Sequence, residues 1–190
     1  MMGGLPPSGP LMSGSEANAR RKGLETFKII GFATIAAVAY GILHDQVTAH
    51  VCVEYFTIAH PPLFPTESPL LLAIGWGIIA TWWVGLLLGI LLAGAARLGR
   101  NAKLSLVHLR RPIVLLMVIS GGIALLSGLV GASLTAFDVI RLPGEWASAI
   151  PSQSWAAFAF ALWAHSASYL VGASGGVFLT VLTLKHRLDT

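Results

Sequence analysis

Residues 69–96 read PLLLAIGWGIIATWWVGLLLGILLAGAA and contain no charged side chain. A helix that crosses the hydrocarbon core of a bilayer needs about 20 predominantly apolar residues, so this run is long enough to cross. Three further apolar runs, at 29–43, 112–136 and 155–184, are joined by short polar segments. Of the 190 residues only 11% are charged and 55% are hydrophobic, and the mean hydropathy is +0.77. This composition indicates an integral membrane protein and excludes a large aqueous catalytic domain.

We predict an all-α membrane protein that folds as a four-transmembrane-helix bundle. Lipid favours helices because every backbone polar group in a spanning segment must be satisfied internally. Ser68 and Pro69 are typical of an N-cap followed by proline in the first turn, and Pro112 suits the same place. Residues 1–24 are expected to form a disordered cytoplasmic tail, because 1–19 are rich in Gly, Pro and Ser. The expected transmembrane domain covers 25–187, with helices at about 27–48, 69–96, 112–136 and 155–185 and outer loops at about 49–68 and 137–154.

The positive charges fall almost entirely on one side of these segments. Of the 12 Lys and Arg residues, all except Arg141 lie before the first run, between the second and third, or after the fourth. The positive-inside rule therefore predicts that both termini are cytoplasmic. The net charge of +4 then reflects topology and contact with anionic lipid, not binding of nucleic acid. A cleaved signal peptide is the alternative for the first run, but its long leading segment and the lack of a clear A-x-A site favour an uncleaved helix.

Each apolar run carries small residues four positions apart. Small side chains at this spacing let helix backbones approach closely, which matters in lipid because apolar bulk gives no driving force for association there. We therefore expect a tightly packed bundle, within one chain or partly through contacts in an oligomer. The four ladders are Ala33, Ala37 and Gly41; Gly77, Thr81, Gly85, Gly89 and Ala93; Ser120, Ala124, Gly128 and Ala132; and Ala164, Ser168, Gly172 and Gly176.

A polar segment, HDQVTAHVCVEYFTIAH at 44–60, follows the first apolar run. Residues 29–43 span only about 22 Å as a helix, so the helix must continue to cross a core of about 30 Å. Asp45 then lies near the outer boundary, on the next rung of the first ladder, and should point toward neighbouring helices. A buried acid is costly without a partner. Because His165 in the fourth run lies at a similar depth, we expect these two residues to pair.

Histidine and carboxylate ligands are typical of sites for zinc, iron or manganese. If the first helix continues, His50 and Glu54 stack one turn apart on a different side from Asp45. If residues 48–57 are extended instead, His50 and Glu54 share a side with Cys52, the only cysteine, which excludes an internal disulfide. The candidate ligands of a divalent metal such as zinc or iron are His44, Asp45, His50, Glu54 and His165, with His60 and Tyr169 as accessory residues.

Two other interpretations stay open. A histidine paired with an acid can carry protons, as in a small transporter or channel component. Alternatively, Asp45 and His165 only join two helices, and the chain is a non-catalytic accessory subunit whose ladders dock a membrane partner. The sequence assigns no catalytic residue and does not decide whether the protein is an enzyme. A haem site and a nucleotide site are not expected, because only His165 is clearly intramembrane and the glycine-rich 172–176 lacks a phosphate-loop lysine.

Three segments resemble a group of uncharacterised bacterial inner-membrane proteins. They are DQVT with EYFTIAHPPLF within 45–64, GWGIIATWWVG at 75–85 and LWAHSASYLVG at 162–172. The similarity covers most of residues 25–185. It implies a multi-pass protein of the bacterial inner (plasma) membrane and implies no particular activity.

Overall fold

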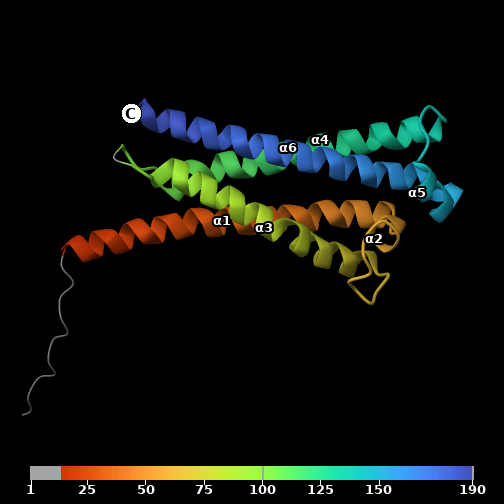
Figure 1. Ribbon diagram of the computed structural model, residues 1–190, viewed down its shortest axis with the longest axis horizontal. Helices are drawn as coiled ribbons and strands as arrows, with labels where there is room; N and C mark the ends of the chain where they lie inside the picture. Colours follow the sequence, from red (N-terminus) through yellow and green to blue (C-terminus); the bar gives the residue numbers. More distant parts are fainter. Residues whose placement is uncertain (1–13, 100, 190) are drawn as a thin grey trace, which may run out of the picture.

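The computed structural model describes residues 14–99 and 101–189, and within these ranges the chain is helical without any strand (Figure 1). Four of the helices, α1, α3, α4 and α6, are long and apolar enough to cross a membrane. The predicted all-α, four-helix membrane architecture is therefore confirmed. In chain order the elements are α1 (Gly14–Val51), α2 (Glu54–Thr57), α3 (Pro69–Arg97), α4 (Leu106–Ala136), α5 (Gly144–Ala149), the 3-10 helix η1 (Ser152–Ser154) and α6 (Trp155–Leu188).

The first helix is longer than predicted. It begins at Gly14 and ends at Val51, instead of covering 27–48. The expectation of a disordered tail is wrong for residues 14–24, and residues 1–13 lie outside the described part of the chain. Ala, Arg, Lys and Glu dominate this added segment and are strong helix formers. Glu16 lies in the first turn, where a negative charge suits the positive end of the helix dipole.

The third spanning helix also begins earlier than predicted. α4 starts at Leu106, so the prediction that Pro112 opens this helix is wrong. Proline removes a single backbone donor, and by the i to i−4 rule this leaves only the carbonyl of His108 without its helical partner. His108 lies in the first turn and is exposed, which makes the missing bond inexpensive. Pro69, by contrast, opens α3 as predicted, with Ser68 at the N-cap position.

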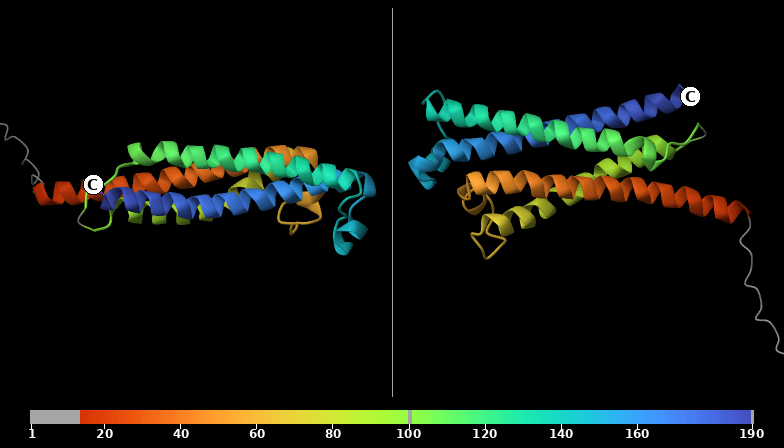
Figure 2. Two further views of the ribbon diagram at one scale, coloured as in Figure 1. Left: turned by 90° about the horizontal axis from the view of Figure 1, so that it is seen from above. Right: turned by 180° about the vertical axis from the view of Figure 1, so that it is seen from behind.

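The bundle consists of two helix pairs, α1 with α3 and α4 with α6, and the helices of each pair cross at an angle (Figures 1 and 2). Glycine permits the first crossing. A Cβ atom added to Gly77 would lie 2.6 Å from Cα of Ile42, and one added to Gly85 would lie 2.7 Å from Cα of Thr34. The ladders of α1 and α3 therefore face each other, as close backbone approach requires. On α6, an added Cβ at Gly172 meets nothing within 4 Å, so this rung does not contribute to packing within the chain.

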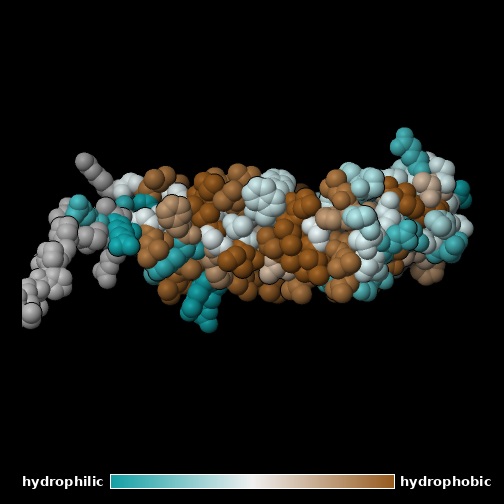
Figure 3. All heavy atoms as spheres, turned by 90° about the horizontal axis from the view of Figure 1, so that it is seen from below, coloured by the Kyte–Doolittle hydropathy of each residue, from teal (hydrophilic) through white to brown (hydrophobic). Residues whose placement is uncertain are grey.

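The surface of the molecule divides along its long axis. Hydrophobic residues cover its middle, and polar residues gather toward both ends (Figure 3). Large apolar side chains such as Leu43, Leu126 and Phe178 are exposed on the spanning helices. In a bilayer these side chains contact acyl chains instead of water, which makes the protein a multi-pass membrane protein.

Arg187 closes the end of the bundle at which α6 terminates. Arg187 is 2% exposed, and its guanidinium donates hydrogen bonds to the carbonyl oxygens of Ala95, Leu98 and Ala102. These carbonyls belong to the end of α3 and the segment after it, where backbone acceptors lack helical partners. A cation at a helix C-terminus also suits the helix dipole. Arg187 therefore ties the two helix pairs together at this end.

Candidate functional site

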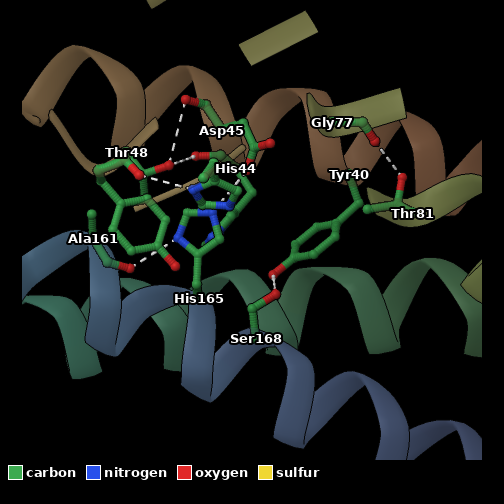
Figure 4. Close-up of polar contacts among 11 residues, drawn as sticks. Tyr40, His44, Asp45, Thr48, Gly77, Thr81, Ala161, His165 and Ser168 are labelled. Carbon is green, nitrogen blue, oxygen red and sulfur yellow. Dashed lines mark hydrogen bonds and ion pairs between the residues drawn. The ribbon is translucent and has the colours of Figure 1, made fainter. Parts of the chain in front are cut away.

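α1 and α6 bring an acid and a histidine together inside the bundle. Asp45 and His165 are each 5% exposed, and Oδ1 of Asp45 lies 3.2 Å from Nε2 of His165. Figure 4 shows the two side chains reaching toward each other from facing helices. The predicted pairing is therefore confirmed, and it follows from the ladder position of Asp45, which places it on the inner side of α1.

The second ring nitrogen of His165 fixes the orientation of its ring and places a hydrogen on Nδ1. Nδ1 lies 2.9 Å from the carbonyl oxygen of Ala161, one turn earlier in α6. A carbonyl only accepts hydrogen bonds, so Nδ1 carries a hydrogen and Nε2 is directed at Asp45. The bond between Nε2 and Oδ1 then holds one proton, either on the imidazole beside an ionised carboxylate or on a neutral carboxyl group. A cation that took the place of this proton would find the imidazole already oriented.

His44 supplies a third candidate ligand. Its ring meets that of His165 edge to face, with centroids 4.6 Å apart. One ring nitrogen of each histidine and one carboxylate oxygen of Asp45 lie within 4.8 Å of one another. Nε2 of His44 is buried and has no hydrogen-bond partner. Because a buried polar atom without a partner costs free energy, its position next to the pair favours a ligand at this point.

Aromatic rings enclose the cluster on the side of the α1–α3 loop. Tyr55 and Phe56 of α2 contact the ring of His165 at centroid distances of 4.6 Å and 5.7 Å. His60 donates from Nδ1 to the carbonyl of Tyr55, 2.8 Å away, and so fixes the conformation of this loop. Burial raises the pKa of the Tyr55 hydroxyl and lowers the pKa of His60, and both shifts favour the neutral form. The enclosure excludes water and strengthens electrostatic interactions within it.

Tyr40 and Ser168 complete the cluster on its other side and were not identified from the sequence. The hydroxyl groups of Tyr40 and Ser168 are 2.7 Å apart, and the ring of Tyr40 stacks on His44 with centroids 5.8 Å apart (Figure 4). Both positions follow from helix periodicity, because Tyr40 precedes His44 by four residues and Ser168 follows His165 by three. Spacing was therefore the signal that could have found them.

The structure does not bring His50 and Glu54 to the three clustered side chains. His50 is exposed, and its Nδ1 donates to the carbonyl of Gln46, 2.7 Å away. Glu54 accepts hydrogen bonds from the hydroxyl of Ser154 at 2.8 Å and from the thiol of Cys52 at 3.4 Å. Its own backbone amide and the Ser154 hydroxyl hold the pKa of the Glu54 carboxyl below its usual value. The role of Glu54 in the structure is to join the α1–α3 loop to the start of α6.

The break between α1 and α2 explains this separation. α1 ends at Val51 and α2 begins at Glu54, so neither one continuous helix nor an extended segment through 48–57 describes the chain. Both alternatives predicted for His50 and Glu54, stacking on one helix and a shared side of an extended segment, are therefore wrong. Of the two accessory residues, His60 lies in the aromatic enclosure. Tyr169 is 53% exposed, with its ring 6.3 Å from that of His165.

Two imidazoles and one carboxylate, arranged with an oriented ring and an unpaired ring nitrogen, are a ligand set that divalent transition metals use in proteins. Aspartate can supply an oxygen, the histidines can each supply one nitrogen, and three protein ligands leave further coordination positions open. This chemistry follows from the geometry of His44, Asp45 and His165 alone. Comparison of the chain with protein-family models, curated proteins and solved structures finds no match.

Proposed function

We propose that this membrane protein binds a divalent transition metal, zinc or iron(II), within its helix bundle through His44, Asp45 and His165. The observation that carries the proposal is that three ligand atoms from two helices lie within 4.8 Å of one another in a buried place. The hydrogen bond from His165 to the carbonyl of Ala161 supports it, because metal-binding histidines are commonly oriented through their second nitrogen.

The distances fit such a site after a small adjustment. Zinc binds nitrogen and oxygen at about 2.0–2.2 Å, so tetrahedral ligand atoms lie about 3.3 Å apart. Oδ1 of Asp45 and Nε2 of His165 are already 3.2 Å apart. The ligand atom of His44 has to move closer by at most about 1.5 Å, which rotation of its side chain provides. A bound ion would act there as a Lewis acid or, if it is iron, as a redox centre.

Metal analysis of the protein purified into nanodiscs tests this proposal. We expect about one zinc or iron per chain, and we expect His44→Gln, Asp45→Asn and His165→Gln each to reduce the content at least tenfold. His50→Gln and Glu54→Gln are matched controls, because neither side chain lies in the cluster, and both should retain the metal. The proposal fails if the wild type holds no metal at micromolar free zinc or iron(II), or if the controls lose it equally.

The shared proton favours a second candidate function, movement of protons through the bundle. The bond between Asp45 and His165 holds one proton in a place from which aromatic rings exclude water. Intramembrane acids and histidines are typical of proton relays. In vesicles with an imposed pH gradient, Asp45→Asn should then abolish proton flux while His50→Gln leaves it unchanged. Equal flux in the wild type, in Asp45→Asn and in empty vesicles would end this alternative.

A further inference from the structure

An apolar cavity of about 470 Å³ lies between α1 and α4, directly beside the metal-ligand cluster. His44 forms part of its wall, together with Tyr40 and Thr48, and the rest of its lining is almost entirely aliphatic. Its size falls in the range of about 300–1,000 Å³ that is usual for pockets that bind small molecules. The cavity therefore has room for a ligand whose polar end would meet His44.

This cavity is open toward the lipid. Leu43 of α1 and Val118 of α4 are both among its lining residues, and they are 69% and 64% exposed. The bundle packs mainly as two pairs, α1 with α3 and α4 with α6, so α1 and α4 are held together less closely than the helices within a pair. Both lining residues belong to spanning helices, and their exposed surfaces contact acyl chains in a membrane. A ligand dissolved in the bilayer can enter from the side.

The polar groups at the cavity restrict the chemistry of the ligand. None of the described residues that line it is Lys, Arg, Asp or Glu, so the side chains of the cavity offer a phosphate or carboxylate head group no counter-charge. The hydroxyl of Tyr40 is already bonded to Ser168. His44, whose buried Nε2 lacks a partner, is the group that still requires a hydrogen bond or a ligand, and its side chain would have to rotate to present this atom to the cavity. A neutral oxygen on an apolar chain needs no counter-charge and can bond to His44.

We propose that the cavity binds a single-chain lipid with a neutral oxygen head group, such as a long-chain alcohol, whose oxygen meets His44 or the metal that His44 holds. The proposal names the ligand class of the metal centre and so rests on the proposed function. The apolar chain would occupy the groove between α1 and α4, where contacts with the aliphatic walls replace its contacts with other lipid chains, so the bond made by its oxygen would supply the preference for this ligand. The head group would fill one of the coordination positions that three protein ligands leave open.

Photolabelling in phosphatidylcholine nanodiscs tests this proposal. The probe is octadecanol with a diazirine on its chain, and cross-linked residues are identified by mass spectrometry. We expect labelling of Leu43 and Val118 that saturates with probe concentration and falls at least fivefold when unlabelled octadecanol is added. Ala39→Phe fills the cavity and should reduce labelling at least fivefold. Ala173→Phe is the matched control, since Ala173 is exposed on α6 outside the lining, and should leave labelling unchanged.

The metal content of the same samples separates the two proposals. The lipid proposal is overturned, and the metal site stands, if metal is bound but labelling rises linearly with probe concentration. In that case unlabelled octadecanol does not reduce the labelling, and both phenylalanine variants are labelled equally. Saturable labelling without metal overturns the metal site and leaves His44 as the polar contact of the lipid. A phosphatidylcholine probe with a diazirine in its acyl chain is the test of the head group. If it labels the cavity as saturably as the alcohol does, the neutral head group is wrong.

Discussion

Asp45 lies on a spanning helix with 5% of its surface exposed. Its hydrogen-bonding neighbours explain why a buried acid is stable at this position. His165 accepts or shares its proton, and the carbonyl of Ala161 in turn orients His165. Next to this chain of hydrogen bonds, Nε2 of His44 is buried without a hydrogen-bond partner. A metal ion or a lipid head group that bonded to this atom would remove the free-energy cost of leaving it unpaired.

Substitution of Asp45 separates its structural role from its ligand role. In Asp45→Asn, an amide N–H can still donate to Nε2 of His165, so the free energy of unfolding should stay close to that of the wild type. Asp45→Ala leaves this nitrogen unpaired and should lower that free energy by about 1–2 kcal/mol. Thermal unfolding in detergent can be followed with a thiol-reactive dye, because Cys52 is the only cysteine and is buried. The measurement is made with a chelator present, so that bound metal adds nothing. Equal midpoints for the alanine variant and the wild type would contradict this assignment.

The pairing of Asp45 with His165 was predictable because two independent constraints, depth in the membrane and ladder position, point to the same side chains. The grouping of His50 and Glu54 with them was wrong, because the chain adopts neither of the two conformations considered for 48–57, a continuing helix or an extended segment. Whether α1 stops at Val51 depends on contacts of the following loop, such as the bond between Glu54 and Ser154, which is 100 residues away in sequence. A long-range contact of this kind leaves no local pattern in the chain.

At the scale of the helices, glycine positions decide which pairs form. Gly77 and Gly85 lie where the backbones of α1 and α3 meet, whereas Gly172 on α6 has open space around it. The sequence predicts four equivalent ladders, since the spacing of small residues is similar in all four runs. Which of these small residues pack against another helix depends on the partner helix, so the sequence of a single helix does not determine it.

The same substitution at two of these glycines should have opposite effects. In Gly85→Ala, the new Cβ would lie 2.7 Å from Cα of Thr34, so the helices must separate, at a cost of about 1–3 kcal/mol in the free energy of unfolding. In Gly172→Ala nothing lies within 4 Å, and the free energy should rise slightly, since alanine favours helix by about 0.5–1 kcal/mol. Thermal midpoints measured with the Cys52 dye compare the two. A stable Gly85→Ala variant would contradict the close crossing, and a destabilised Gly172→Ala variant would show that another chain covers this face.

Helix ends were harder to predict than the helices themselves. The hydrophobic cores of all four spanning helices were located correctly, because an apolar run long enough to cross a bilayer has few alternative structures. The extra turns of α1 and α4 lie outside the apolar runs and depend on helix propensity and on local pairs such as Glu25 with Lys28. Such weak preferences make a short helical extension difficult to distinguish, in the sequence, from an unstructured polar tail.

At the scale of the whole molecule, the distribution of charge predicts the orientation. All the Lys and Arg residues except Arg141 lie in the N-terminal half of α1, at the C-terminal end of α6, or in the α3–α4 connection and the adjoining turns of α3 and α4, while Arg141 lies in the α4–α5 connection. We therefore predict that both termini and the α3–α4 connection face the cytoplasm. The cluster of His44, Asp45 and His165 would then lie in the outer half of the membrane, on the side of α2 and α5.

Protease protection of epitope tags in bacterial spheroplasts checks this orientation. Tags at the C-terminus and after Asn101 should survive external protease, because the positive-inside rule places them in the cytoplasm. A tag after Asp138, in the exposed connection that follows α4, should be digested. Permeabilised spheroplasts, in which all three tags should be lost, provide the control. Digestion of the C-terminal tag in intact spheroplasts would reverse the predicted orientation.

X-ray absorption at the zinc edge of the zinc-loaded protein tests the central claim, coordination by His44, Asp45 and His165, most directly. The account predicts two imidazole nitrogens and at least one oxygen at about 2.0–2.2 Å. The smaller amount of zinc that His44→Gln and His165→Gln still bind should show one imidazole fewer, and His50→Gln should change nothing. A spectrum of the bound zinc that is the same in all four proteins, or that loses an imidazole only in His50→Gln, would contradict it.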